Sequence, residues 1–234
     1  MQELKSLFER YDNIVFFDTE TTGLDPNGDQ VIEIAAISFR ENEVVEMDEF
    51  VTLRDADARL PEKIVELTGI TDEMLSQHGI TEQAAAEEFA EIVNGAESGQ
   101  SERTLLVAHN ANFDLCFVRW WLVAKRLPIL EFVDTVTVFK DRRAYPHKLS
   151  NAIAAYHLQD KVQNTHRAID DVRALVEVTK AMAAERDDLL RYVNLFGYNP
   201  KYGAPPNRIK GVRYVPQRFN DYMTSVNNAL YALR

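Results

Sequence analysis

Short apolar runs separated by polar turns dominate the first half of the chain. The run at 14–17 is followed by strand-like runs at 30–40 and 43–52, with a tight polar turn between the last two. This pattern predicts three antiparallel strands at the start of the chain. Two further strand-like runs, at 104–108 and 131–134, alternate with helical patterns.

Helical spacing of apolar residues marks the rest of the chain. We expect helices at 62–67, 82–93, 113–125, 149–157 and 167–184, and another that starts near 136. Strands in hairpins followed by strand–helix alternation predict an α/β fold in which helices flank a mixed five-stranded sheet. A basic, proline-containing stretch at 140–148 is expected to form a loop, which either contacts phosphates or is a solvated surface.

Composition narrows the class of protein. With 234 residues and 46% hydrophobic residues, the chain can bury a sizeable core. It has no apolar stretch that could span a bilayer and no signal peptide, so we expect a cytoplasmic protein with no membrane partner. The single cysteine, Cys116, excludes an internal disulfide.

The charge divides the chain into two parts. From residue 189 onward the chain has seven basic residues and one acidic residue, a net charge of +6. Because the whole chain has a net charge of −11, the first 188 residues have a net charge of −17. We therefore expect a body at 1–188 and a basic, aromatic-rich C-terminal extension at 189–234. The extension could bind a nucleic-acid strand, but packing on its own acidic body is the favoured alternative. An apolar stripe near the end keeps docking to a partner open: Tyr222, Val226, Leu230 and Leu233.

Two carboxylates end the first apolar run. Because strand side chains alternate between faces, Asp18 and Glu20 share a face with Ile14 and Phe16. Two adjacent buried acids are costly without a compensating cation, and residues 12–38 contain no Lys or Arg. A bound Mg²⁺ or Mn²⁺ is the favoured compensation, and a solvated strand-end turn is the alternative.

Two further acids stand out by position. Asp114 heads the apolar stripe of the helix after the 104–108 run, so it either faces inward or is an ordinary first-turn acid. In the 167–184 helix, periodicity places Asp171 on the inward face and Asp170 on the solvated one. His166 can reach the same site as Asp171 only if it lies in the non-helical lead-in, because five helical positions separate side chains by about 140°.

These segments together resemble a known family. The ordered motifs are Asp-Thr-Glu-Thr-Thr-Gly at 18–23, His-Asn-Ala-Asn-Phe-Asp at 109–114, and His166 with Asp171. They resemble the DEDDh (DnaQ-like) 3′–5′ exonucleases, which include polymerase III proofreading subunits and ribonuclease T. The resemblance covers about residues 12–184 and leaves the extension outside it.

The resemblance implies a ribonuclease-H-like fold and a two-metal site. It implies that Asp18 bridges two divalent ions, that Glu20 and Asp171 complete one site, and that Asp114 supports the other. It assigns His166 as the general base, since an imidazole can accept a proton from water at neutral pH.

Substrate contacts follow from position and from the resemblance. Thr21, Thr22, Gly23 and Leu24 come directly after the acidic strand, where backbone amides can meet a 3′ terminus. In related enzymes the leucine wedges against the terminal base, and Phe113 is expected to stack there, with core packing as the alternative for both. The candidates also include His109 and Asn110, although shaping the loop that aims Asp114 is the role that their position favours.

The leading functional hypothesis is a metal-dependent 3′–5′ exonuclease. Its expected substrates are single-stranded or frayed DNA 3′ ends, and its products are nucleoside 5′-monophosphates. One alternative is RNA 3′-end trimming, as in ribonuclease T. The other is a polymerase-tethered proofreading module whose tail docks a DNA polymerase.

Overall fold

A mixed five-stranded sheet forms the centre of the protein. The computed structural model describes residues 1–41, 43–94, 102–197 and 209–216. The strands are β1 Asn13–Thr21, β2 Val31–Phe39, β3 Val44–Phe50, β4 Thr104–Ala108 and β5 Glu131–Asp134. Their order in the sheet is β3-β2-β1-β4-β5: neighbouring strands among β1 to β3 are antiparallel, and β1, β4 and β5 are parallel. The predicted mixed sheet is therefore confirmed.

The predicted helices are confirmed to within a few residues. They are α2 Glu62–Thr68, α4 Glu82–Asn94, α5 Ala111–Ala124, α6 Thr135–Arg142, α7 Leu149–Ala155 and α8 Ala168–Glu185, preceded by η1 Gln2–Leu4 and α1 Lys5–Phe8. The pattern did not reveal α3 Asp72–His78, although it has a sequence signal. The hydroxyl of Thr71 caps it by accepting a hydrogen bond from the amide of Met74 at 3.2 Å.

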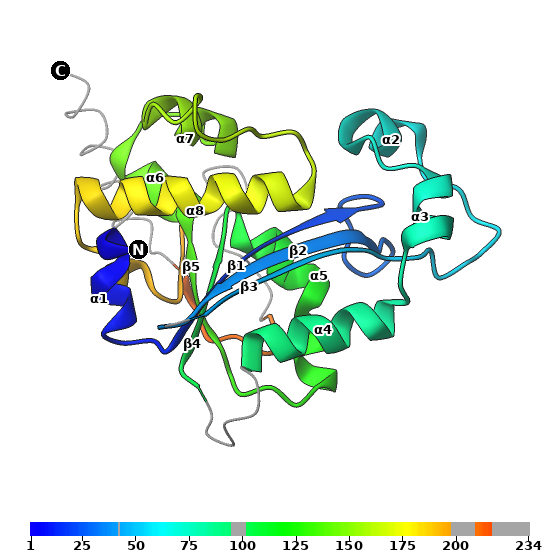
Figure 1. Ribbon diagram of the computed structural model, residues 1–234, viewed down its shortest axis with the longest axis horizontal. Coiled ribbons are helices and arrows are strands. Elements are labelled where there is room, and N and C mark those ends of the chain that lie inside the picture. The colour runs from blue at the N-terminus through cyan, green and yellow to red at the C-terminus, as the bar shows by residue number, and fades with distance from the viewer. Residues whose placement is uncertain (42, 95–101, 198–208, 217–234) are drawn as a thin grey trace.

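Helices cover both faces of the sheet (Figure 1). Ile14 and Phe16 of β1 are buried with the apolar stripe of α8 on one face. Val15 and Phe17, which point the other way, are buried with residues of α4 and α5. Because β1 is apolar on both faces, it lies at the centre of three layers, and its end carries the acids into the space between them.

One predicted loop is partly wrong. The basic stretch at 140–148 begins inside α6, and Arg142 is buried there with 3% of its surface exposed. Its guanidinium pairs with Asp188 at 2.5 Å and with Glu185 at 3.3 Å. This cation is therefore neutralised by the end of α8 and its linker, and only residues 143–148 form the loop.

Parts of the basic extension pack on the body. The segment after α8 contains η2 Leu189–Tyr192 and β6 Leu195–Phe196, and β6 pairs with β7 Val215–Pro216. Phe196 is 1% exposed and its ring centroid lies 4.4 Å from that of Phe132 on β5. Within these two segments the favoured alternative, packing on the body, describes the structure.

The rest of the extension lies outside the described residues. This includes the predicted C-terminal stripe at 222–233. The division of the chain at residue 188 stays a prediction. Among the helices of the described residues, none has the length and apolar character needed to cross a membrane.

Candidate active site

Four carboxylates from three elements lie close enough to interact electrostatically. Asp18 and Glu20 come from the end of β1, Asp114 from the first turn of α5, and Asp171 from the first turn of α8. The negative charges of Glu20, Asp114 and Asp171 each raise the pKa of Asp18. The cluster therefore lies at the carboxyl end of β1, where helices from opposite faces of the sheet meet.

Asp114 is fixed by a single residue of β1. Its Oδ1 accepts hydrogen bonds from the backbone amide of Thr19 at 3.1 Å and from the Thr19 hydroxyl at 2.8 Å. Asp114 is 2% exposed, so the alternative of an ordinary solvated first-turn acid is wrong. Thr19 lies between Asp18 and Glu20 in the chain, and this contact ties α5 to the acidic strand end.

Asp171 lies beside Glu20 and His166. Ligand atoms of these three residues all lie within 4.8 Å of one another. Asp171 is 6% exposed, which confirms the inward position chosen by periodicity, and its Oδ2 accepts a hydrogen bond from Asn164 at 2.7 Å. His166 is exposed, precedes α8 and has a φ of 57°, so the expected non-helical lead-in is confirmed.

This donor set fits a hard divalent cation. Within the described chain Asp171 Oδ1 is buried and has no hydrogen-bond partner, which is costly for a carboxylate unless a cation binds it. Oxygen donors dominate the cluster, as Mg²⁺ and Mn²⁺ prefer. Three more carboxylates nearby supply the negative charge that such an ion would neutralise.

The electrostatics of the cluster agree with this fit. Burial, followed by the neighbouring acids, raises the pKa of Asp18 well above its ordinary range and that of Glu20 to about 8. Burial likewise raises the pKa of Asp171, and it raises that of Asp114 to about 7 despite the hydrogen bonds from Thr19. Without a cation the cluster therefore holds protons that a bound metal would displace.

The turn after β1 is held by its own side chains. Thr21 donates its hydroxyl to the carbonyl of Gly23 at 2.7 Å, and Thr22 donates its hydroxyl to Asp29 at 3.0 Å. A Cβ at Gly23 would lie 2.4 Å from Asp29 Oδ2, so glycine lets this carboxylate reach the turn. The amide of Thr22 donates to the carbonyl of Gln30 at 2.9 Å and is therefore engaged within the turn.

Leu24 projects from this turn into solvent. Its side chain is 84% exposed, so the alternative of simple core packing is wrong for this residue. Phe113 is half-buried, and its ring centroid lies 4.9 Å from that of Phe117. Phe113 thus packs partly against the core and stays partly accessible.

His109 and Asn110 shape the connection from β4 to α5. The pKa of His109 is lowered to about 4 by burial, and its Nε2 lies 3.0 Å from the carbonyl oxygen of His147. Asn110 adopts a φ of 74°, a left-handed conformation that asparagine tolerates. Its backbone amide donates a hydrogen bond to Asp134 Oδ1 at 3.0 Å. These contacts fit the loop-shaping alternative.

Sequence reasoning missed two acids that hold the site. Asp134, at the end of β5, accepts hydrogen bonds from the amides of Asn110 and Ala111 and so fixes the start of α5. Glu33 on β2 is fully buried and accepts hydrogen bonds from the amide of Ala168 and the guanidinium of Arg167. A charged residue inside the apolar run at 31–37 was the available signal for Glu33.

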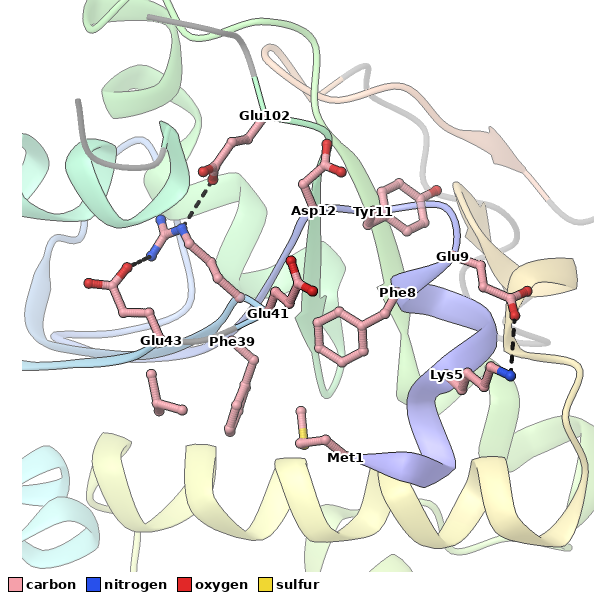
Figure 2. Close-up of a pocket in the computed structure, with 12 residues that line it drawn as sticks. Met1, Lys5, Phe8, Glu9, Tyr11, Asp12, Phe39, Glu41, Glu43 and Glu102 are labelled. Carbon is pink, nitrogen blue, oxygen red and sulfur yellow. Dashed lines mark hydrogen bonds and ion pairs between the residues drawn. The ribbon is translucent and has the colours of Figure 1, made fainter. Parts of the chain in front are cut away.

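A large cavity lies elsewhere and does not suit a polyanion. It measures about 1030 Å³ and opens between α1, the start of β1 and the β2–β3 hairpin (Figure 2). None of the predicted site residues lines it. Its acidic side chains outnumber its basic ones, Lys5 and Arg40. Lys5 pairs with Glu9, as Figure 2 shows, and Arg40 pairs with Glu43 and Glu102. Nucleic acid would be repelled from this cavity.

Fold and site together define a class of protein. A mixed sheet covered by helices, with four carboxylates at the carboxyl end of its central strand, is the arrangement of ribonuclease-H-like nuclease domains. A family model described as exonuclease matches residues 15–179. The chain therefore belongs to the exonuclease family, and the predicted family, fold class and enzyme class are confirmed.

Relatives and solved structures agree with this assignment. A PolC-type DNA polymerase III of Clostridium perfringens is 34% identical over 197 residues, which are 82% of this chain and 12% of that polymerase. The DNA polymerase III subunit epsilon of Treponema pallidum is 34% identical over 186 residues, 76% of this chain and 80% of that subunit. E. coli exonuclease I in complex with a dA16 oligonucleotide shares the fold, with a TM-score of 0.63 and 19% identity over 77% of this chain and 42% of that one. The chain thus spans only a small part of the PolC-type polymerases that it matches.

Proposed function

We propose that this chain is a metal-dependent 3′–5′ exonuclease that degrades single-stranded or frayed DNA 3′ ends to nucleoside 5′-monophosphates. The observation that carries the proposal is that ligand atoms of Glu20, His166 and Asp171 lie within 4.8 Å of one another. Asp18 and Asp114 are close enough to this group to raise the pKa of Glu20 or to have their own pKa raised by it. The DNA substrate is supported by relatives named as DNA polymerase III proteins and by the oligonucleotide bound to exonuclease I.

The carboxylates are the proposed ligands of two divalent ions, Mg²⁺ or Mn²⁺. When bound, such a pair stabilises negative charge on the attacking and leaving oxygens of a phosphodiester displacement. Thr19 holds Asp114 toward β1, and Asn164 orients Asp171 so that its Oδ1 remains available. The protein thus fixes the ligands before any metal arrives.

His166 is the proposed general base. Its side chain is exposed to solvent beside Glu20 and Asp171, so it can accept a proton from the attacking water. Leu24 is the proposed wedge against the 3′-terminal base, and Phe113 is the proposed stacking partner of that base. The exposure of Leu24 and the partial exposure of Phe113 support these roles. Gly23 and the threonines 21 and 22 shape the turn that presents Leu24.

The test uses 5′-labelled single-stranded DNA, duplex DNA and RNA of one sequence, each with Mg²⁺ or Mn²⁺. We expect a ladder of shortened, still labelled DNA products and nucleoside 5′-monophosphates by chromatography. Asp18→Ala should abolish the reaction, whereas Asp160→Ala, which removes an exposed acid outside the cluster, should not. Early release of the label or internal cuts would refute the proposal, and faster loss of RNA would favour RNA trimming.

A polymerase partner is a second proposal, favoured by the names of the relatives. It is tested by co-purification with a replicative DNA polymerase. Because residues 189–197 and 209–216 pack on the body, the truncation should delete only residues 217–234. Loss of the polymerase on this deletion supports docking by the end of the chain, and its retention refutes that.

A further inference from the structure

A stripe of accessible side chains runs along α5 away from the carboxylates. Phe113 and Cys116 are half-buried and Trp120 is 49% exposed. Trp120 follows Phe113 by seven positions, so it lies on the same side of the helix, about 10 Å further along the axis. The stripe therefore starts beside Asp114 and ends at an exposed tryptophan.

Two cations flank this tryptophan. The guanidinium carbon of Arg119 lies 5.4 Å from the Trp120 ring centroid, and Nζ of Lys210 lies 4.5 Å from it. Lys210 arrives from a distant segment because Gly211, at a φ of 88°, packs on Leu122, where a Cβ would lie only 2.9 Å from the Leu122 Cβ. Within the described chain neither cation has an ion pair.

Arg119 also connects this surface to the turn after β1. Its guanidinium donates to the carbonyl of Pro26 at 3.2 Å and to Asn27 Oδ1 at 2.8 Å. The guanidinium also donates to the carbonyl of Cys116, and all three acceptors are neutral, so none of them offsets the positive charge of Arg119. Pro26 lies two residues after Leu24, so Arg119 joins the turn that carries the exposed leucine to the helix that carries Trp120.

The local charge differs from that of the whole protein. Residues 115–130 and 209–213 contain five cations and no acid, in a chain of net charge −11. Lys125 pairs with Glu87 of α4 at 2.6 Å, which leaves four of these cations without an ion pair among the described residues. A half-exposed tryptophan between two cations is the combination that binds single-stranded nucleic acid, since bases stack on the ring and cations meet phosphates. Lys210 has a flexible stem and can turn from the ring to a phosphate.

We propose that Phe113, Arg119, Trp120 and Lys210 form an upstream strand-binding surface for single-stranded DNA. This inference rests on the proposed function. With a base stacked at Phe113, Trp120 meets the nucleotide about three positions upstream, given a stacked rise of about 3.4 Å. The surface would hold the strand while its 3′ end lies at the carboxylates.

Binding without turnover is the first test. Anisotropy of 5′-fluorescein-labelled (dT)12 in EDTA should give a Kd about 5- to 150-fold higher for Trp120→Ala, the loss of one stacked base. Trp120→Phe should restore most of the affinity. Val44→Ala, which trims another exposed apolar residue on β3, should stay within about twofold of wild type.

The salt dependence of the same binding tests Lys210. Lys210→Gln should reduce the slope of log Kd against log salt by about 0.7, the value for one phosphate contact with a single strand. Lys5→Gln removes an exposed lysine of α1 and should not change the slope. An unchanged slope for Lys210→Gln overturns the phosphate contact.

Turnover separates this inference from the proposed function. Trp120→Ala should lower the ratio of kcat/KM for (dT)12 to that for the dinucleotide pdTpdT, because the dinucleotide cannot reach Trp120.

If wild type cleaves both substrates and Trp120→Ala keeps the ratio and the Kd, the surface is refuted and the exonuclease stands. If wild type cleaves neither, the proposed function fails, and the binding assay still decides the surface. If Trp120→Ala binds (dT)12 with the same Kd as wild type, the inference is overturned, and a protein partner becomes the remaining candidate for this surface.

Discussion

The carboxylate of Glu33 lies 2.7 Å from Nη2 of Arg167, the residue that follows His166. Glu33 is opposite Glu20 in the β1–β2 register, and its second oxygen accepts a hydrogen bond from the first amide of α8 at 2.8 Å. The guanidinium of Arg167 also lies over the Phe50 ring, 4.9 Å from its centroid. One buried acid thus sets the distance from the acidic strand to the lead-in that carries His166 and to the helix that carries Asp171.

We expect Glu33→Gln to destabilise the protein by about 3 kcal/mol, because it leaves a partly buried guanidinium without its counter-charge. Urea denaturation measures this loss. Glu46→Gln is the matched control, since Glu46 also pairs a strand with α8, through Arg173, but about half of each side chain is exposed. It should cost less than about 1 kcal/mol. Equal losses for the two variants would contradict the role of Glu33.

Replacing His166 should slow hydrolysis without unfolding the protein. His166→Ala is expected to lower kcat roughly 10²–10⁴-fold, the usual contribution of a positioned general base. His157→Ala is the control, because His157 is also exposed and also has a φ of 57°. Single-turnover rates on 5′-labelled DNA measure both variants. Near-normal turnover by His166→Ala would exclude it as the base.

Divalent metal should stabilise the folded chain through Asp171. At a concentration 100 times its Kd, Mn²⁺ would add about 2.7 kcal/mol if it binds only the folded state. Asp171→Asn should remove most of this gain, whereas Asp170→Asn should keep it, because Asp170 points away and accepts a hydrogen bond from Thr165. Thermal unfolding with and without Mn²⁺ measures the gain. A full gain in Asp171→Asn would contradict its role as a ligand.

The metal-free protein should lose stability as the pH rises. The pKa of Glu20 is raised from 4.5 to about 8 and that of Asp114 from 3.8 to about 7, so the folded state binds more protons than the unfolded state between these limits. The free energy of unfolding therefore decreases from about pH 4 to about pH 8. Urea midpoints in EDTA at pH 5 to 8 measure this slope, and Glu20→Gln should make it shallower. An identical slope in Glu20→Gln would argue against the raised pKa of that carboxyl.

Much of the fold was predictable because the sequence of β1 itself indicates what surrounds the strand. Apolar residues on both of its faces required a layer of helices on each side, and the acids at its end required a cation or solvent. Periodicity also separated Asp171 from Asp170, since only one of two adjacent helical positions can face the core. The helix α3 was missed because its seven residues bury only Leu75 and give little periodic signal.

Other features depend on contacts between distant segments. Arg142 was expected in a loop that either contacts phosphates or is a solvated surface, but it is buried against Asp188, which lies 46 positions away in the chain. The pairing of Trp120 with Lys210 needs Gly211 to approach α5, which no local pattern reveals. No cation lies within six positions of Glu33 in the sequence, and its partner Arg167 lies 134 residues further on.

The sequence by itself determined the strands, most of the helices and the residues with the right chemistry, because these depend on alternation, helical period and side-chain type within a few positions. Only the tertiary structure decided that Asp114 reaches the acidic strand through Thr19 while Asp171 approaches it from the other face of the sheet. The physical reason is that a carboxylate's environment, including its burial, its partners and its pKa, is made by segments that are far apart in the chain and meet only when the layers pack.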